Sequence, residues 1–218
     1  MGDKESAVSC AVVCLDCDKS AIEKAKKIGA NLIITHHPVI FGGVKSVVKG
    51  DVVYELIKND ISVISMHTNL DVAVGGVTDT LCETLGLTDI SPFTATDGFT
   101  IRSATVNQNA DNFAKTIKEK LNFDVRYVGE GTIKNALVCS GSGGDYIYDA
   151  INNNFDALIT ADCKHHQFID ALNSGVALFD CGHKASEDVI VPKLIKTLSH
   201  EFSEITFTPF INNLFKCV

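Results

Sequence analysis

Two adjacent histidines close an apolar run in the segment IITHHPVIF (33–41), and a proline follows them directly. In an uninterrupted strand the two imidazoles would point to opposite faces of the sheet. If Pro38 ends the strand and the backbone turns at His36 and His37, the two rings can bind different metal ions instead of competing for one. The pair is therefore the first candidate for metal binding.

Two other apolar runs end in a histidine that is followed, after three intervening residues, by a carboxylate. The first is ISVISMHTNLD (61–71), with His67 and Asp71, and the second is VALFDCGHKASE (176–187). A turn or a first helical turn would bring each pair to one side of the chain. The second pair consists of His183 and Glu187.

Imidazole nitrogens and carboxylate oxygens without a neighbouring cysteine pair are the ligands of catalytic zinc, manganese or iron rather than of structural zinc. A single histidine of this kind would more often be a hydrogen-bonded structural residue, but several histidines together with carboxylates favour a metal centre. There are more candidates than one open catalytic ion needs, and they suit two ions about 3.5–4 Å apart with a bridging carboxylate. These candidates are His36, His37, His67, Asp71, His183 and Glu187.

Two further motifs each leave two interpretations open. The segment KHH (164–166) follows an apolar strand and opens a helix. His165 is therefore either a proton shuttle facing the cleft or part of a solvated helix start, and the two interpretations have equal weight. The glycine-rich segment SGSGGD (140–145) is either a phosphate-binding loop or, with greater weight, a plain turn.

An internal repeat places the metal-ligand candidates at equivalent strand ends. With an offset of 125 residues, AVVCLDCDKSAIEKAKKIGANLIIT (11–35) matches ALVCSGSGGDYIYDAINNNFDALIT (136–160) without a gap, and seven of the 25 positions are identical. Each copy predicts a strand, a helix and a second, parallel strand. Ligands of α/β sheets lie beyond the carboxyl ends of parallel strands. We therefore expect two related halves with the metal site between them.

The remaining segments alternate between strand and helix patterns. TIRSATV (100–106), NADNFAKTIKEKLN (109–122) and FDVRYVG (123–129) predict a strand, a helix and a strand. The tail predicts a helix over 186–202, with a break or a start at Pro192, and a last strand in EITFTPFI (204–211). This alternation indicates an α/β fold with mixed sheets.

One segment, TDISPFTATDG (88–98), reads as the boundary between the two halves. The sequence therefore predicts a first α/β half over 1–97, with the HHP and HTNLD motifs. The second α/β half, over 98–218, carries the GSGG and GHKASE motifs.

The composition is that of an ordinary globular protein of 218 residues with a formal net charge of −8. This charge argues against a nonspecific nucleic-acid binder, and no apolar run approaches the ~20 residues that would span a bilayer. Eight cysteines are too sparse for a disulfide scaffold. We expect reduced thiols and a cytoplasmic protein. In SCAVVCLDC (9–17) the thiols read as small buried side chains, with Cys17 on the face opposite to Cys10 and Cys14.

Four motifs occur in order through nearly the whole chain: LIITHHPVIFGGVKSV, HTNLDVAVGGVTDTL, CSGSGGD and CGHKASE. Together they resemble the GTP cyclohydrolase I type 2 family, also called NGG-interacting-factor-like proteins. The resemblance implies two related α/β domains around a dinuclear site for divalent zinc, iron or manganese, and a ring-shaped hexamer built from dimers. Where many members have Gly in a TGE motif, this chain has Ala161 and Asp162.

The resemblance also implies a role for each candidate. His67 becomes a group beside the ligands or facing the substrate. The implied ligands are His36 and His37 on separate ions, Asp71 as a terminal ligand, His183, and Glu187 as the bridge between the ions.

Three functions are compatible with this site. The first is a metal-dependent hydrolase acting on a nucleotide-like small molecule, in which two ions generate hydroxide at neutral pH. With GTP, that hydroxide would attack C8 of guanine. The second is a metal-dependent phosphoesterase, because dinuclear centres serve that reaction equally well. The third is a non-enzymatic metal-carrying or regulatory interaction protein.

Overall fold

The computed structural model describes residues 1–212, and the chain forms two compact units. The first unit holds Met1–Leu70 together with the chain from Val191 onward, and the second holds Asp71–Ile190. Both units are α/β, one with a parallel sheet and one with a mixed sheet, which confirms the expected fold class. The chain thus leaves the first unit and returns to it, whereas the sequence placed a single division near residue 97.

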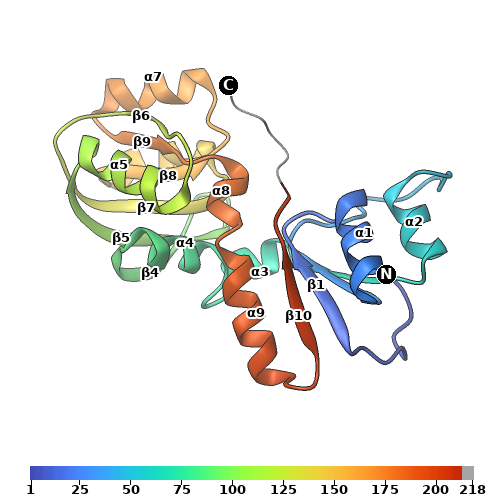
Figure 1. Ribbon diagram of the computed structural model, residues 1–218. Coiled ribbons are helices and arrows are strands. Elements are labelled where there is room, and N and C mark those ends of the chain that lie inside the picture. The colour runs from blue at the N-terminus through green and yellow to red at the C-terminus, as the bar shows by residue number, and fades with distance from the viewer. Residues whose placement is uncertain (213–218) are drawn as a thin grey trace. The chain divides into compact units, whose positions relative to one another are not determined.

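The first unit is built on a four-stranded parallel sheet with the strand order β10-β1-β2-β3. Figure 1 shows α1 and α2 beside this sheet, and α9 leading into β10. α3 (Thr68–Val72) connects the two units along the chain. The other elements are β1 (Cys10–Cys14), α1 (Lys19–Ile28), β2 (Leu32–Thr35), α2 (Val52–Lys58), β3 (Ser62–Ser65), α9 (Ile190–Glu201) and β10 (Thr206–Phe210).

Continuous apolar runs explain this parallel sheet, because parallel strands are normally covered on both faces. Val12, Ile33 and Val63 stand in one row across β1, β2 and β3. They pack into one core with Ile22 of α1 and Leu56 of α2. The polar residues that follow each strand therefore emerge at the edge of a tightly packed layer.

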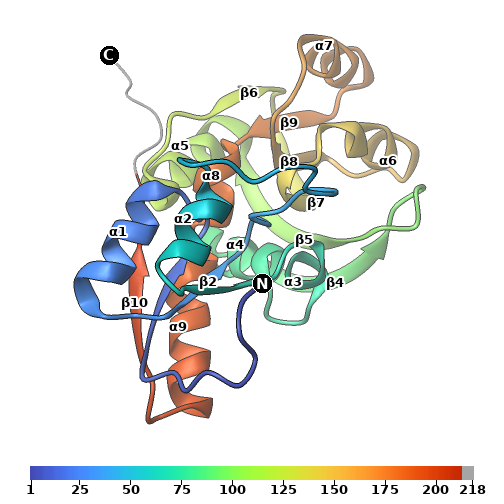
Figure 2. The same ribbon diagram turned by 90° about the vertical axis from the view of Figure 1, so that its right-hand side faces the viewer.

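The second unit is built on a six-stranded mixed sheet with the order β4-β5-β7-β8-β9-β6. β7, β8 and β9 run parallel, whereas β4, β5 and β6 pair antiparallel with their neighbours. Figure 2 shows α6 and α7 on the side of β8 and β9. The strands are β4 (Thr88–Thr94), β5 (Thr100–Asn109), β6 (Arg126–Val128), β7 (Thr132–Ser142), β8 (Ala157–Ala161) and β9 (Ala177–Asp180). The helices are α4 (Val77–Leu85), α5 (Ala110–Leu121), the 3-10 turn Gly144–Tyr146, α6 (Ile147–Asn152), α7 (His165–Ser174) and α8 (His183–Glu187).

Alternate side chains of β7 enter two separate cores, as expected of a strand buried on both faces. Ala136 and Val138 pack with α4 and α5, where Phe113 meets Phe179 edge to face at 5.2 Å between ring centroids. Leu137 packs into the other core with α6 and α7. The sheet is therefore the middle of three layers.

The internal repeat of the sequence is also a repeat of structure. Ala11 of β1 pairs with Leu32 of β2, and Ala136 of β7 pairs with Ala157 of β8. Both copies thus keep the same register at the same offset of 125 residues. β3 and β9 each add a third parallel strand beside the pair. The expected equivalence of the two strand-helix-strand segments is confirmed.

The other predicted elements are largely present. The pattern after residue 99 forms β5, α5 and β6, and the tail forms α9 and β10. The expected boundary segment instead contains β4, which pairs with β5 at the edge of the sheet. The expectation for Cys17 is wrong, because it lies beyond the end of β1 and packs against the same core as Cys14. Within residues 1–212 the cysteines are free, and no helix is long and apolar enough to cross a membrane.

Arg102 on β5 is a buried cation that organises the segment between α3 and α4. It is 4% exposed, and its guanidinium pairs with the Asp79 carboxylate. The same guanidinium donates to the carbonyl oxygens of Val72 at 2.9 Å and Ala73 at 3.2 Å. Asp79 also accepts a hydrogen bond from the Gly75 amide at 2.7 Å. One ion pair therefore fixes the backbone that follows Asp71.

Arg102→Met should lower the free energy of unfolding of the second unit by ~3–5 kcal/mol, because it leaves the Asp79 carboxylate buried without its countercharge. Urea unfolding followed by circular dichroism measures the change. Lys118→Met is the matched control, since Lys118 is exposed in its pair with Asp124 and should leave the urea midpoint nearly unchanged. Equal losses in the two variants would contradict the prediction.

Candidate metal centre

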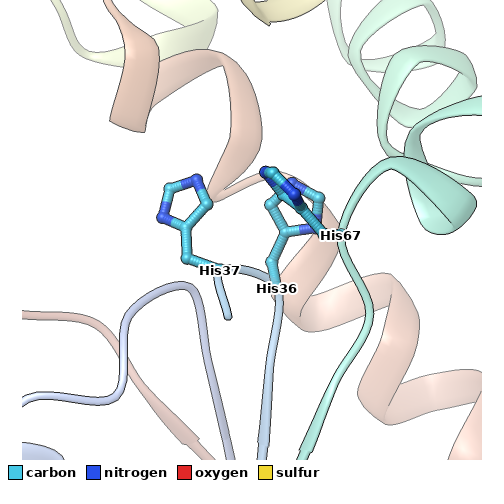
Figure 3. A group of neighbouring side chains, drawn as sticks. All are labelled: His36, His37 and His67. Atoms are coloured by element: carbon cyan, nitrogen blue, oxygen red, sulfur yellow. The ribbon is translucent and has the colours of Figure 1, made fainter. Parts of the chain in front are cut away.

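Three histidines of the first unit lie together beyond the carboxyl ends of its strands. His36 and His37 follow β2, and His67 follows β3. One ring nitrogen of each lies within 4.8 Å of the other two, a grouping that can hold a metal ion. The ring centroids of His36 and His37 are 5.1 Å apart. The centroid of His67 lies 5.5 Å from that of His36 and 5.8 Å from that of His37. Figure 3 shows the His37 ring beside the rings of His36 and His67, which overlap in this view.

The backbone around the adjacent pair confirms the predicted turn. The chain bends at His36 and His37, immediately before Pro38. The amides of the two residues still donate to the carbonyl oxygens of Cys14 and Leu15, at 3.2 and 2.9 Å. Neighbouring backbone therefore holds the bend in place, and both imidazoles reach the same group although they are adjacent in sequence.

Each of these two imidazoles is oriented by its second nitrogen. His36 Nδ1 lies 2.7 Å from the carbonyl oxygen of Met66, and His37 Nδ1 lies 2.7 Å from the carboxylate of Asp16. Both partners accept, so Nδ1 carries a proton in each ring, and Nε2 is the candidate ligand atom. This is the usual arrangement of metal-binding histidines, in which an outer acceptor fixes the tautomer and the ring orientation. Sequence reasoning missed Asp16, although it follows β1 as His37 follows β2.

The second unit carries a carboxylate and a histidine on α8. His183 and Glu187 are one helical turn apart, and His183 Nε2 lies 3.2 Å from a Glu187 carboxylate oxygen. Glu187 is 4% exposed. His183 Nδ1 donates to Asp162 at 2.7 Å, so this ring is also oriented by a carboxylate. Asp162, at the position where the sequence departs from the TGE motif, therefore has a defined contact.

The Asp71 carboxylate is hydrogen-bonded within the second unit. It accepts a hydrogen bond from the Ser140 hydroxyl at 3.2 Å. Ser140 in turn lies 2.9 Å from the Thr78 hydroxyl. Since a serine hydroxyl has one proton and gives it to Asp71, Thr78 donates to Ser140. A chain of two hydroxyls thus orients the carboxylate that was expected to be a terminal ligand.

The glycine-rich segment after Ser140 is explained by close packing. A Cβ at Gly141 would clash with the Glu187 carboxylate, and the residue adopts a left-handed φ of 62°. A Cβ at Gly143 would meet Thr160 Oγ1 at 2.5 Å, and one at Gly144 would clash with Gln167. These contacts favour the turn interpretation over the phosphate-binding loop. They also assign a role to Gly141 that the sequence did not suggest.

The charge state of His183 follows from its neighbours. Its pKa is raised from 6.5 to about 9, chiefly because Glu187 accepts a hydrogen bond from it and attracts its charged form, with a further contribution from Asp162. The metal-free protein therefore holds this imidazole protonated at neutral pH. A metal ion that binds Nε2 must displace that proton, so its affinity rises with pH.

The remaining candidates lie at the surface. His165 and His166 are exposed at the start of α7, as the helix prediction required, and the role of His165 as a proton shuttle stays a prediction. His200 is exposed near the end of α9.

Burial raises the pKa of Cys17 to about 12 and also raises that of Cys14, so both thiols are protonated at neutral pH. This supports a packing role for these cysteines.

Comparison with known sequences supports the resemblance carried by the motifs. The model of the family described as Duf34/NIF3 (NGG1p interacting factor 3) matches residues 1–213. A Clostridium perfringens protein named "GTP cyclohydrolase 1 type 2 homolog" is 33% identical over 95% of this chain and 84% of its own length. A Campylobacter jejuni protein of the same name is 34% identical over 92% of this chain and 81% of its own length.

Solved structures with the same fold are also known. The crystal structure of Staphylococcus aureus hypothetical protein SA1388 covers 100% of this chain and 90% of its own, with a TM-score of 0.89 and 30% identity. Reduced HcgD from Methanocaldococcus jannaschii covers 96% of this chain and 86% of its own, with a TM-score of 0.82 and 24% identity. The second likeness concerns the fold alone.

Gly141→Ala should destabilise the protein and reduce its metal content, because the new methyl group would push the Glu187 carboxylate away. Gly131→Ala is the matched control, since Gly131 also has a left-handed φ, of 80°, but a Cβ there meets nothing within 4 Å. Both variants bear a conformational cost of ~1–2 kcal/mol. Only Gly141→Ala should lose more than this in urea unfolding and lose metal in elemental analysis. Identical behaviour of the two variants would contradict the assigned role.

The His183–Glu187 pair predicts a pH dependence in the metal-free protein. The folded-state pKa of His183 is raised, so the pair's contribution to stability is complete below pH 6.5 and is lost as the pH rises through about 9. Glu187→Gln should return the pKa towards 6.5 and flatten the stability profile in this window. An NMR titration of the imidazole, with urea unfolding at each pH, measures both effects. An unchanged pKa in the variant would refute the pairing.

Proposed function

We propose that this chain, which belongs to the Duf34/NIF3 (NGG1p interacting factor 3) family, is a metal-dependent hydrolase acting on a nucleotide-like small molecule. The observation that carries the proposal is the orientation of three imidazoles. In His36, His37 and His183 the Nδ1 atom is bonded to an acceptor at 2.7 Å. Nε2 is thereby left as the ligand atom, which is how proteins prepare histidines for metals.

The donors suit two divalent ions, of zinc, iron or manganese. His36 and His37 would each bind a separate ion through Nε2, and Asp71 would be a terminal ligand. Glu187 would bridge the ions, since a carboxylate offers one oxygen to each, and His183 would complete the set. When bound, the ions lower the pKa of a bound water so that hydroxide is available at neutral pH, and they polarise the bond under attack.

The remaining residues of the site hold these donors in place. The Met66 carbonyl, Asp16 and Asp162 accept hydrogen bonds from the Nδ1 atoms of the three histidines. The Ser140 hydroxyl donates a hydrogen bond to the Asp71 carboxylate. His67, which lies among the first unit's histidines, is proposed to face the substrate, where it can hold or release a proton. His165, exposed at the start of α7, is proposed as a proton shuttle.

Support for a nucleotide-like substrate comes from the name "GTP cyclohydrolase 1 type 2 homolog" that the relatives carry. We also propose a homohexamer in the cytoplasm, in keeping with the motif resemblance. Phosphoester hydrolysis uses the same kind of centre and differs only in the bond that is attacked. Closed coordination of the ions would instead favour metal storage or a regulatory role.

Glu187→Gln should reduce the content of both ions together, because it removes the negative charge that offsets their mutual repulsion while preserving the size of the side chain. Asp71→Asn should mainly empty one site. Elemental analysis after dialysis, on variants whose fold is verified by circular dichroism, measures the stoichiometry. His200→Ala is the control, since this exposed histidine should not change the metal content.

Two results would contradict the proposal. One is full metal content in folded Glu187→Gln, and the other is a parent protein that never binds a transition metal. Activity is tested by incubating the metal-loaded parent with nucleotides and with phosphate esters. Ring opening of GTP supports the hydrolase, release of inorganic phosphate supports the phosphoesterase, and tightly held ions without turnover support the non-enzymatic alternative.

A further inference from the structure

An open arch of chain follows the two adjacent histidines. Val39 and Val52 pack against the core of the first unit at its two ends. Every residue from 40 to 49 is exposed. Gly42 has a left-handed φ of 78°, and a Cβ on this residue would meet nothing within 4 Å. The arch, residues 40–49, is thus held at its ends and accessible along its length, which is the form of many binding loops.

Phe41 stands at the start of the arch, close to the histidines. Its side chain is 83% exposed, compared with 46% for Phe202 and 38% for Phe123, the other exposed phenylalanines of the described chain. The Phe41 ring lies 6.3 Å from the His67 ring between centroids, at an interplanar angle of 77°. Burying a phenylalanine normally stabilises a fold, because its ring has a large apolar surface. The first unit does not use this ring for packing, and the ring is left accessible beside His67.

The arch also differs in charge from the rest of the protein. It contains Lys45 and Lys49 and no acidic residue, in a chain whose net charge is −8. A cationic segment in an acidic protein raises the local concentration of anions. The arch therefore combines a flat apolar ring next to the histidine group with two cations further along the chain.

We infer that Phe41 stacks on the planar heteroaromatic ring of the substrate, and that Lys45 and Lys49 attract its phosphate groups. The inference rests on the proposed function and assigns to the arch the recognition of a phosphorylated heteroaromatic molecule, the class to which nucleotides belong. Stacking on an aromatic side chain suits any nucleobase, since every base has a π-face. The ring contact with His67 places the stacked ring next to the first unit's metal ligands.

The absence of tryptophan from the sequence gives a direct test. Phe41→Trp introduces a single indole whose fluorescence should be quenched when GTP binds, whereas inorganic triphosphate, which has no ring, should leave it unchanged. Phe202→Trp is the matched control, because it places the indole at another exposed phenylalanine of the first unit. Quenching by GTP only at position 41 is the expected result. Equal quenching at both positions, or none at position 41, would overturn the inference.

Affinity measurements separate this inference from the proposed function. Phe41→Ala should weaken GTP binding ~5- to 150-fold in isothermal titration calorimetry, the range expected for the loss of one stacked base. Binding of inorganic triphosphate and the metal content should both match the parent. Unchanged GTP binding with normal metal content would refute the stacking role and leave the metal centre standing. If the parent protein binds no metal under any condition and still binds GTP through Phe41, the proposed hydrolase is refuted, whereas the stacking role of Phe41 is supported.

An exposed apolar ring can also contact a second copy of the chain, and the oligomeric state tests this alternative. If Phe41 contacts a second copy of this chain instead of a substrate, Phe41→Ala should change the mass measured by light scattering. An unchanged mass with weakened GTP binding supports the inference. A smaller assembly with unchanged GTP binding would overturn it.

Discussion

The buried carboxylate of Glu187 is the constraint around which the site residues of the second unit are arranged. An ionised carboxylate that is 4% exposed is tolerated only with charged or hydrogen-bonding partners around it. His183 supplies one partner from the preceding turn of the same short helix. β7 makes room by having Gly141 where any other residue would clash. Asp162 then holds the far side of His183. One charge thus ties together α8 and the ends of β7 and β8.

The internal repeat preserves positions at strand ends while changing the residues that fill them. With the offset of 125 residues, Asp16 corresponds to Gly141, and His37 corresponds to Asp162. Yet in each unit a carboxylate at one strand end bonds to a histidine beyond the next strand. Asp16 pairs with His37 in the first unit, and Asp162 pairs with His183 in the second, each at 2.7 Å. The shared geometry of the parallel strands therefore sets the contact. The first unit forms it after β1 and β2, the first two strands of its repeat, whereas the second unit forms it one strand later, after β8 and β9.

The sequence predicted those parts of the molecule that depend on local pattern. The ungapped repeat predicted the strand-helix-strand units, and the proline after His36 and His37 indicated the bend. Contacts over long sequence separations were out of reach. Ser140 lies 69 positions from Asp71, and nothing in the local sequence of either indicates the bond. β4 was hidden for a related reason, since an edge strand rich in turn-forming residues has little apolar pattern of its own.

The two adjacent histidines, His36 and His37, have different surroundings. The Nδ1 proton of His36 goes to a neutral backbone carbonyl, and His36 is 2% exposed. The Nδ1 proton of His37 goes to the carboxylate of Asp16, and its side chain is 24% exposed. In metal sites, a carboxylate bonded to one ring nitrogen makes the other nitrogen a stronger metal ligand than a backbone carbonyl does. The two adjacent imidazoles are therefore not equivalent ligands, because different acceptors fix their Nδ1 atoms and because the two side chains differ in exposure.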